Sequence, residues 1–246
     1  MLSLGFISLA AATAAIILIG FHFALKRSPL EASQRRSKWR TAFIGLVLWA
    51  LYLLIVDYTD VINSFELPPR FPIFLILPLF AFTAFFLYRN RNSPVLHAIP
   101  KSWPVYFQSF RLLIESLFVL ALADQILPVQ VTFEGYNFDM LFAATAIPLA
   151  YLSFQRKLLP ERVVLWWNYL GLAVIASIIF LFTTTFFFPS VWGASSTLAS
   201  EEVFSFAFMV VPGFLMPAAV FMHFLSIIQL RRSLAKQEQQ RPALSV

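Results

Sequence analysis

Cysteine is absent from the 246 residues of this chain. The absence excludes disulfide bonds, thiolate nucleophiles and iron–sulfur clusters. Charged residues are also scarce, at 12 % of the chain, whereas 60 % of the residues are hydrophobic. This balance is typical of an integral membrane protein rather than of a soluble domain.

Sequence motifs for common catalytic chemistries are missing too. The chain has three isolated histidines, no H-E-x-x-H pair, no G-x-S-x-G turn, no phosphate-binding loop and no dinucleotide fingerprint. Segment 203–229 lacks lysine, which a retinal Schiff base would require. We therefore expect no metal and no cofactor, and we assign no enzymatic activity. The basic residues form no nucleic-acid-binding module, so a nucleic-acid partner is not expected.

Long apolar stretches dominate what is present. They occupy 2–25, 41–56, 71–88, 106–123, 140–154, 163–187 and 203–229. One helical crossing needs about 20 residues, so seven crossings use about 140 and leave only short loops. The sequence predicts an all-α membrane protein with one seven-helix bundle over 1–230 and a basic tail over 231–246.

The basic residues fix an orientation for these crossings. If the connections alternate between two sides, one side receives Lys26, Arg27, Arg35, Arg36, Lys38, Arg40, Arg89, Arg91, Lys101, Arg156, Lys157, Arg162, Arg231, Arg232, Lys236 and Arg241. The other side receives Arg70. Positive residues stay in the cytoplasm, so the N-terminus is predicted outside and the C-terminus inside.

Segment 106–123 carries unusual polar residues. Gln108, Arg111 and Glu115 are spaced at i, i+3 and i+7, so they share one helical face. Each charge costs about 2.5–3.5 kcal/mol on membrane insertion, which predicts an Arg111–Glu115 pair facing the bundle interior. Such a pair can serve function or pin helix packing, and the sequence leaves both open.

Three further polar residues lie at a similar depth in other segments: His22, Asn168 and His223. With the residues of 106–123 they would form one buried polar layer. A layer of this composition suits an anionic headgroup or a proton relay. A single histidine in a membrane helix also commonly hydrogen-bonds to a neighbouring helix, which is the structural alternative.

A second group is expected in the outer loop before 140–154. Glu134, Asn137 and Asp139 lie there, and eight carboxylates in total fall on the outer side. Their oxygens would suit a cation, and a solvated acidic surface is the alternative. Asn137 is positioned to cap the next helix. Asp139 lies at the start of that helix, where the helix dipole favours a negative charge.

Prolines interrupt two of the expected helices. Pro148 falls within 140–154, and Pro212 and Pro217 fall within 203–229. Each removes a backbone donor and leaves the carbonyl four residues earlier without its helical partner. Two interpretations are open. The kinks either only shape the bundle, or they form a hinge or a cavity lined by free carbonyls.

Part of the chain resembles a group of uncharacterised bacterial integral membrane proteins. The resemblance rests on Q-S-F-R at 108–111 with Glu115, T-F-E-G-Y-N-F-D at 132–139 and T-A-I-P at 145–148. It covers about 106–170 and the proline-containing last segment. It implies a bacterial inner membrane and seven helices, and brings no activity with it.

We therefore expect a non-enzymatic integral membrane protein that binds or senses a lipid or small amphipathic ligand at the polar layer. A small proton-coupled transporter and a structural or accessory subunit are the alternatives. Membrane lipids and one small-molecule or lipid ligand are the expected partners, and the sequence offers no docking motif for a protein.

Overall fold

The chain is built from helices. A computed structural model describes residues 1–193 and 200–240, and no strand occurs within these ranges. Six helical segments of the described chain are long and apolar enough to cross a membrane, with mean hydropathies between 1.5 and 2.3. This is the architecture of a multi-pass helical membrane protein.

The elements of the first half are α1 (Leu2–Arg27), α2 (Ala32–Tyr58), η1 (Pro72–Ile76), α3 (Leu77–Asn90), α4 (Pro94–Ala98), α5 (Ser102–Phe107), η2 (Gln108–Phe110), α6 (Arg111–Ala123) and η3 (Val129–Val131). Those of the second half are α7 (Asp139–Ala144), α8 (Ala146–Ala150), η4 (Tyr151–Gln155), α9 (Glu161–Phe187), η5 (Pro189–Trp192), η6 (Glu201–Phe204), α10 (Phe206–Val210), η7 (Val211–Leu215) and α11 (Met216–Gln240). Three of them, η1, η4 and η7, are π turns, and the other η elements are 3₁₀ turns. Three of the long segments are composite: η1–α3, α5–η2–α6 and α10–η7–α11.

The connection between α1 and α2 is shorter than expected. The sequence placed it over residues 26–40, between the first two apolar stretches. The Ser28 hydroxyl donates to the Leu25 carbonyl at 2.7 Å and ends α1. Glu31 and Gln34 then form a capping box that starts α2. Most of the stretch that the sequence placed in a loop is therefore the first turns of a helix.

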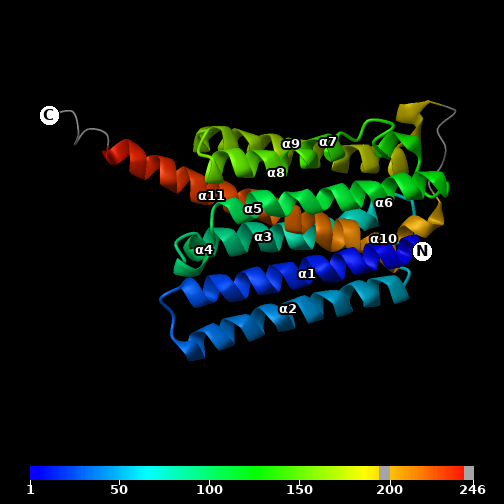
Figure 1. Ribbon diagram of the computed structural model, residues 1–246. Coiled ribbons are helices and arrows are strands. Elements are labelled where there is room, and N and C mark those ends of the chain that lie inside the picture. The colour runs from blue at the N-terminus through cyan, green and yellow to red at the C-terminus, as the bar shows by residue number, and fades with distance from the viewer. Residues whose placement is uncertain (194–199, 241–246) are drawn as a thin grey trace.

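The helices run side by side along one axis, with the start of α1 and the end of α11 at opposite ends of the bundle (Figure 1). The pair α1 and α2 lies at one edge, and α7, α8 and α9 lie at the other. The composite segment α10–η7–α11 passes between them and is the most buried of the six. Its interior position makes it the element against which the polar side chains of the other helices pack.

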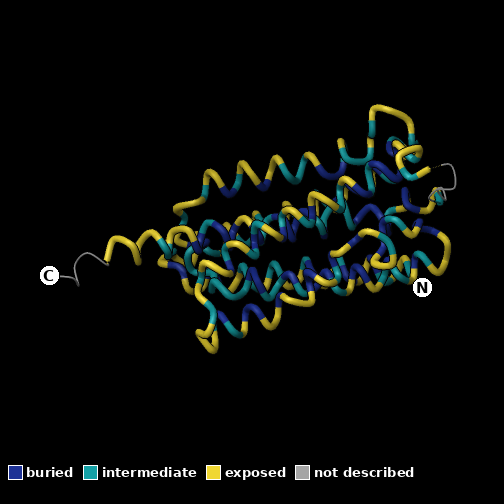
Figure 2. The backbone as a smooth tube through the Cα atoms, turned by 90° about the horizontal axis from the view of Figure 1, so that it is seen from above, coloured by how far each residue is buried: buried dark blue, intermediate teal, exposed yellow. Residues whose placement is uncertain are grey.

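The last turns of α11 project beyond the bundle (Figure 1). Figure 2 shows this extension mostly exposed, whereas buried residues line the inside of the bundle. The tail predicted from residue 231 is therefore a continuation of α11 as far as Gln240. Arg241, which the sequence assigned to the same basic side, lies outside the described residues.

The expected helix over 140–154 is broken. Thr145 separates α7 from α8, and η4 follows directly after α8. Pro148 lies within α8 and has no N–H to donate to the Ala144 carbonyl, which explains why the helix is interrupted near this point. This segment is not one of the six long spans.

Candidate functional site

The polar face predicted on segment 106–123 points into the bundle. Gln108, Arg111 and Glu115 have exposed fractions of 0 %, 2 % and 1 %. The 3₁₀ turn η2 precedes α6 directly and places Gln108 beside Arg111, where the Arg111 Nη1 donates to Gln108 Oε1 at 3.4 Å. Gln108 in turn donates through Nε2 to the Ala219 carbonyl of α11 at 3.0 Å.

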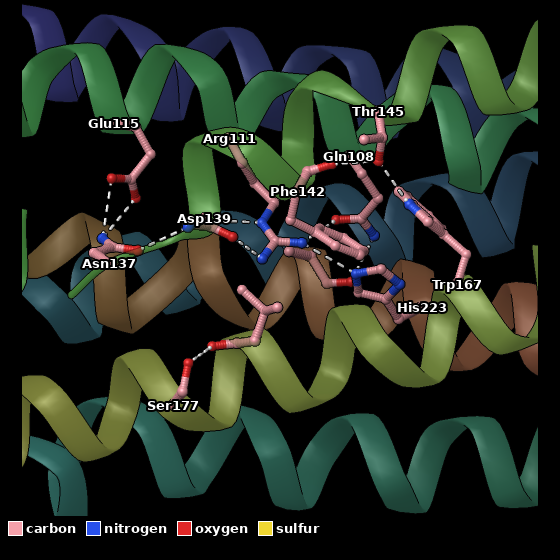
Figure 3. A network of polar contacts seen from close by, with 12 residues as sticks. Gln108, Arg111, Glu115, Asn137, Asp139, Phe142, Thr145, Trp167, Ser177 and His223 are labelled. Atoms are coloured by element: carbon pink, nitrogen blue, oxygen red, sulfur yellow. Dashed lines mark hydrogen bonds and ion pairs between the residues drawn. The ribbon is translucent and has the colours of Figure 1, made fainter. Parts of the chain in front are cut away.

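Arg111 forms its ion pair with Asp139, so the predicted pairing with Glu115 is wrong. Its Nε donates to Asp139 Oδ2 at 3.0 Å, and its Nη2 binds Asp139 Oδ1, giving a two-point contact. Asp139 is the first residue of α7 and 5 % exposed. The sequence had placed this residue on an outer acidic surface, yet the loop folds inward and delivers it to the guanidinium (Figure 3).

Asn137 connects the two carboxylates. Its Nδ2 lies 3.1 and 3.0 Å from the two oxygens of Glu115 and 3.1 Å from the Val131 carbonyl. Its Oδ1 accepts from the backbone N–H of Asp139 at 3.0 Å. Phe138, not Asn137, is the N-cap residue of α7, although the Asn137 side chain still satisfies the first helical N–H.

Gly135 allows this loop to fold so closely. A Cβ on Gly135 would come within 2.9 Å of the Gln130 Cα and would also collide with the Val129 carbonyl. The loop therefore needs glycine for space rather than for a positive φ angle. This close packing brings Asn137 and Asp139 from the loop into the bundle interior.

His223 and Asn168 extend the network across α11 and α9. Arg111 Nη1 lies 3.1 Å from His223 Nε2, and His223 Nδ1 lies 2.9 Å from Asn168 Oδ1. A guanidinium can only donate, so Nε2 accepts and the proton resides on Nδ1. Asn168 then donates through Nδ2 to Ser226 Oγ at 3.0 Å. The geometry assigns a neutral imidazole held in one tautomer.

An aromatic group covers one side of the guanidinium. The Arg111 Cζ lies 5.1 Å from the centre of the Phe142 ring, which stacks on Trp167 at 4.5 Å. Trp167 Nε1 donates to Thr145 Oγ1 at 2.8 Å, which ties α9 to the break between α7 and α8. Gly171 leaves room for this packing, since a Cβ there would lie 2.6 Å from Phe142 Cζ.

Two candidates from the sequence lie outside the network. His22 is exposed on α1, so its inclusion in the buried layer is wrong. Glu134 is exposed in the loop, apart from the buried Asn137 and Asp139, so the three do not form one outer group. No group of three or more histidine, aspartate or glutamate residues in the described ranges is arranged to hold a metal ion.

A cavity adjoins the network. Its volume is about 90 Å³, and it is lined mainly by phenylalanine, isoleucine and leucine side chains, together with Arg111, Glu115 and Asp139. One water molecule requires roughly 10–15 Å³ of such volume, so the space holds several waters or part of a ligand. A mostly apolar cavity with polar groups gathered at one place is the usual form of a small-molecule site.

Two π turns form part of the cavity wall. Pro72 of η1 and Pro212 of η7 both line it. Each turn is followed by a further proline, Pro78 in α3 and Pro217 in α11, that has no N–H for the carbonyl four residues earlier. π turns are frequent at functional sites of membrane and soluble helices.

Sequence reasoning missed the two residues that satisfy those carbonyls. Trp49 Nε1 donates to the Gly213 carbonyl at 2.7 Å, and Tyr52 Oη donates to the Phe74 carbonyl at 2.9 Å. Gly213 and Phe74 are the residues four positions before Pro217 and Pro78. Of the carbonyls expected to be free at the proline kinks, that of Gly213 is thus capped by an aromatic donor of α2. A second donor of the same helix caps the Phe74 carbonyl, which the sequence analysis had not singled out.

No family model, curated protein or solved structure matches the chain.

Proposed function

We propose that this chain is a seven-crossing protein of a bacterial inner membrane that binds a lipid or small amphipathic ligand in the cavity beside Glu115. The N-terminus would lie outside and the C-terminus in the cytoplasm, as the positive-inside distribution favours. The start of α1 and the end of α11 lie at opposite ends of the bundle, which supports an odd number of crossings (Figure 1). The bacterial inner membrane follows from the resemblance alone.

The seventh crossing would be α7–α8–η4, from Asp139 to Gln155. At 1.5 Å per residue it is about 25 Å long, somewhat less than a hydrocarbon core of about 30 Å. A short segment is accommodated by local thinning of the bilayer. It packs against α5 and α9 within the bundle, which supports a crossing rather than a surface segment.

One observation carries the ligand proposal: Glu115 lines the cavity with hydrogen-bonding capacity to spare. Its two oxygens share one side-chain donor, Asn137 Nδ2, among the described residues. Arg111 is engaged by Asp139, so within these residues Glu115 has no ion-pair partner. An apolar ligand that carries one hydrogen-bonding head group would place its body against the phenylalanines and its head group at Glu115.

A small proton-coupled transporter is the second candidate. Glu115 is a buried carboxyl with no cation bound to it in the described chain, and it lies between a cavity and the Asn137–Asp139 connection. Intramembrane carboxyls in this situation commonly exchange protons in carriers. The same cavity would then be the site through which a substrate moves.

Native mass spectrometry of protein extracted with its own lipids tests the ligand proposal. Glu115→Gln changes the cavity carboxyl, and Ser116→Ala changes the exposed neighbour on the same helix as a matched control. We expect one defined ligand on the wild type and on Ser116→Ala, and its loss from Glu115→Gln. Retention by all three proteins would contradict binding at Glu115. An apo mass for all three would favour a carrier or a structural subunit, and a flux assay on Glu115→Gln would decide between these two.

A further inference from the structure

A second hollow lies at the end of the bundle where α9 begins. It is a cleft of about 720 Å³ between η4, the first turn of α9 and the last turns of α11. Its charged and polar lining includes Lys101, Ser153, Lys157, Glu161, Arg162 and Glu238. None of these residues belongs to the network around Arg111, so the cleft is a separate feature.

Two of the three basic residues that line the cleft are paired with carboxylates, and the third has no ion-pair partner among the described residues. Lys101 Nζ pairs with Glu161 Oε1 at 2.7 Å, and Arg162 Nη2 pairs with Glu238 Oε1 at 2.9 Å. Lys157 is exposed and forms no ion pair within the described residues. The N-terminal end of α9 adds about half a positive charge from its dipole. The cleft is therefore electrostatically suited to an anion.

Hydrogen-bond donors in the cleft are also unused. The Ser153 side chain is more than nine-tenths buried, and its Oγ has no hydrogen-bond partner in the described chain. Helix α9 starts after Pro160 without a side-chain cap from any described residue. The Val163 N–H donates to the Pro160 carbonyl at 3.0 Å, which leaves the N–H groups of Glu161 and Arg162 without a partner in the described chain. A phosphate group binds readily to uncapped helix N-termini.

An acceptor is unused as well. Glu161 Oε2 is buried and without a hydrogen-bond partner in the described ranges, although Oε1 of the same side chain binds Lys101. This oxygen suits a donor placed a few ångströms beyond the phosphate. An ethanolamine ammonium or a glycerol hydroxyl has such a donor, whereas the quaternary ammonium of choline has none.

Exposed apolar residues continue from the cleft along α9. Leu158 precedes the helix with an exposed fraction of 68 %, and Trp166 and Leu170 lie on the helix at 71 % and 57 %. Their spacing of four residues along α9 places Trp166 and Leu170 on one face. This stripe provides a surface for acyl chains, which a free phosphate ion would not use.

We propose that this cleft binds the phosphate of a phospholipid whose head group also carries a hydrogen-bond donor, namely ethanolamine or glycerol. Lys157, Ser153 and the α9 N-terminus hold the phosphate, Glu161 accepts from the head group, and the acyl chains follow α9. Basic pockets between helices at the cytoplasmic side bind lipid head groups in this manner. The site goes beyond the ligand cavity and does not depend on Glu115.

The test titrates phosphatidylethanolamine, phosphatidylglycerol and phosphatidylcholine of identical acyl chains onto delipidated full-length protein, with bound lipid counted by native mass spectrometry. The variants are Lys157→Gln and Ser153→Ala, and Lys38→Gln on α2 is the matched control for loss of an exposed lysine. We expect one retained phosphatidylethanolamine or phosphatidylglycerol on the wild type and on Lys38→Gln, and weak retention of phosphatidylcholine. Loss of one lysine contact raises the dissociation constant about fivefold.

Three results would overturn the proposal. Equal retention of the three lipids would remove the role of Glu161, and unchanged binding by both Lys157→Gln and Ser153→Ala would remove the site. Displacement of the lipid by millimolar inorganic phosphate would identify a free anion as the occupant. Glu115→Gln is expected to keep this lipid, so failure of the cavity proposal and failure of this one are distinguishable.

Discussion

Arg111 and Asp139 form a two-point ion pair in which both side chains are almost fully buried. Removal of either partner leaves an unpaired charge in a low-dielectric interior, which costs about 3–5 kcal/mol. We therefore expect Arg111→Ala and Asp139→Ala each to lower the unfolding temperature strongly in a thermal scan of purified protein. The double variant Arg111→Met/Asp139→Leu is expected to recover much of the loss. An Asp139→Ala protein as stable as the wild type would contradict this assignment.

His97 lies in α4, outside the six long spans, with its Nε2 in contact with Arg232 Nη1. Burial lowers the pKa of His97, and the positive charges of Arg232 and Lys236 lower it further, whereas a hydrogen bond from the ring to the backbone carbonyl of Arg91 raises it. The depressed pKa means that the unfolded chain binds a proton before the folded chain does. Stability from this histidine is therefore complete above the ordinary histidine pKa and is lost as the pH falls below it.

This pH dependence is measurable by NMR titration of the histidine rings. We expect the His97 pKa below its ordinary value in the wild type, and a rise toward that value in Arg232→Gln. Lys38→Gln removes an exposed lysine of α2 and serves as the control, with no change expected. A His97 pKa that is the same in Arg232→Gln and in the wild type would show that the Arg232 charge does not act on the ring.

The site could be predicted from the sequence only where its residues belong to one helix. Helical spacing correctly placed Gln108, Arg111 and Glu115 on an inward face, because their relative directions depend on local geometry alone. The partner of Arg111 depends on how the loop before α7 folds back, and no periodicity describes a loop. Asp139 was therefore assigned to the outside, although it is the residue that completes the ion pair.

At the scale of elements, α2 stabilises two proline-interrupted helices at once. Trp49 and Tyr52 are one turn apart, their rings lie 4.8 Å apart, and each donates to a carbonyl that a proline leaves free. Aromatic residues near the ends of membrane helices commonly anchor the interface, so residue type alone does not indicate this role for Trp49 and Tyr52. The prolines themselves indicated that free carbonyls would need donors, but not which helix would supply them.

We expect Trp49→Phe and Tyr52→Phe each to destabilise the protein by about 0.5–1.5 kcal/mol, the usual contribution of one hydrogen bond. Tyr58→Phe is the control, because Tyr58 is on the same helix and 88 % exposed. In the Trp49→Phe background, Pro217→Ala restores a backbone donor for the Gly213 carbonyl and should recover stability. Equal unfolding temperatures for Tyr52→Phe, Tyr58→Phe and the wild type would argue against the contact of α2 with η1.

The boundaries of the elements were predicted unevenly, for a physical reason. Apolar run length located the six long spans, because a bilayer demands a minimum length. It placed the start of α2 nine residues late, at 41 rather than at Ala32, because a helix continues past the membrane wherever a capping box such as Glu31 and Gln34 starts it in water. It also gave no sign that residues 139–155 would break into α7, α8 and η4.

For the whole molecule, the number of crossings decides on which side every later loop lies. Six crossings would leave the loop before α9 outside, whereas seven place it in the cytoplasm with the phospholipid cleft. The charges favour seven, since Arg156, Lys157 and Arg162 surround this loop. The absence of native cysteine makes the chain suitable for a labelling test, because every introduced thiol reports on one position alone.

Single cysteines at Glu66 and Leu158, both exposed, distinguish the two topologies. In intact cells treated with a membrane-impermeant maleimide, we expect Glu66→Cys to be labelled and Leu158→Cys to be protected. Leu158→Cys should react fully once the membrane is permeabilised, which shows that its thiol is accessible. A second internal position, Lys38→Cys, precedes the disputed segment and should be protected under either topology. Labelling of Leu158→Cys in intact cells, with Lys38→Cys still protected, would mean that α7–α8–η4 does not cross the membrane and that the cleft faces the outer leaflet.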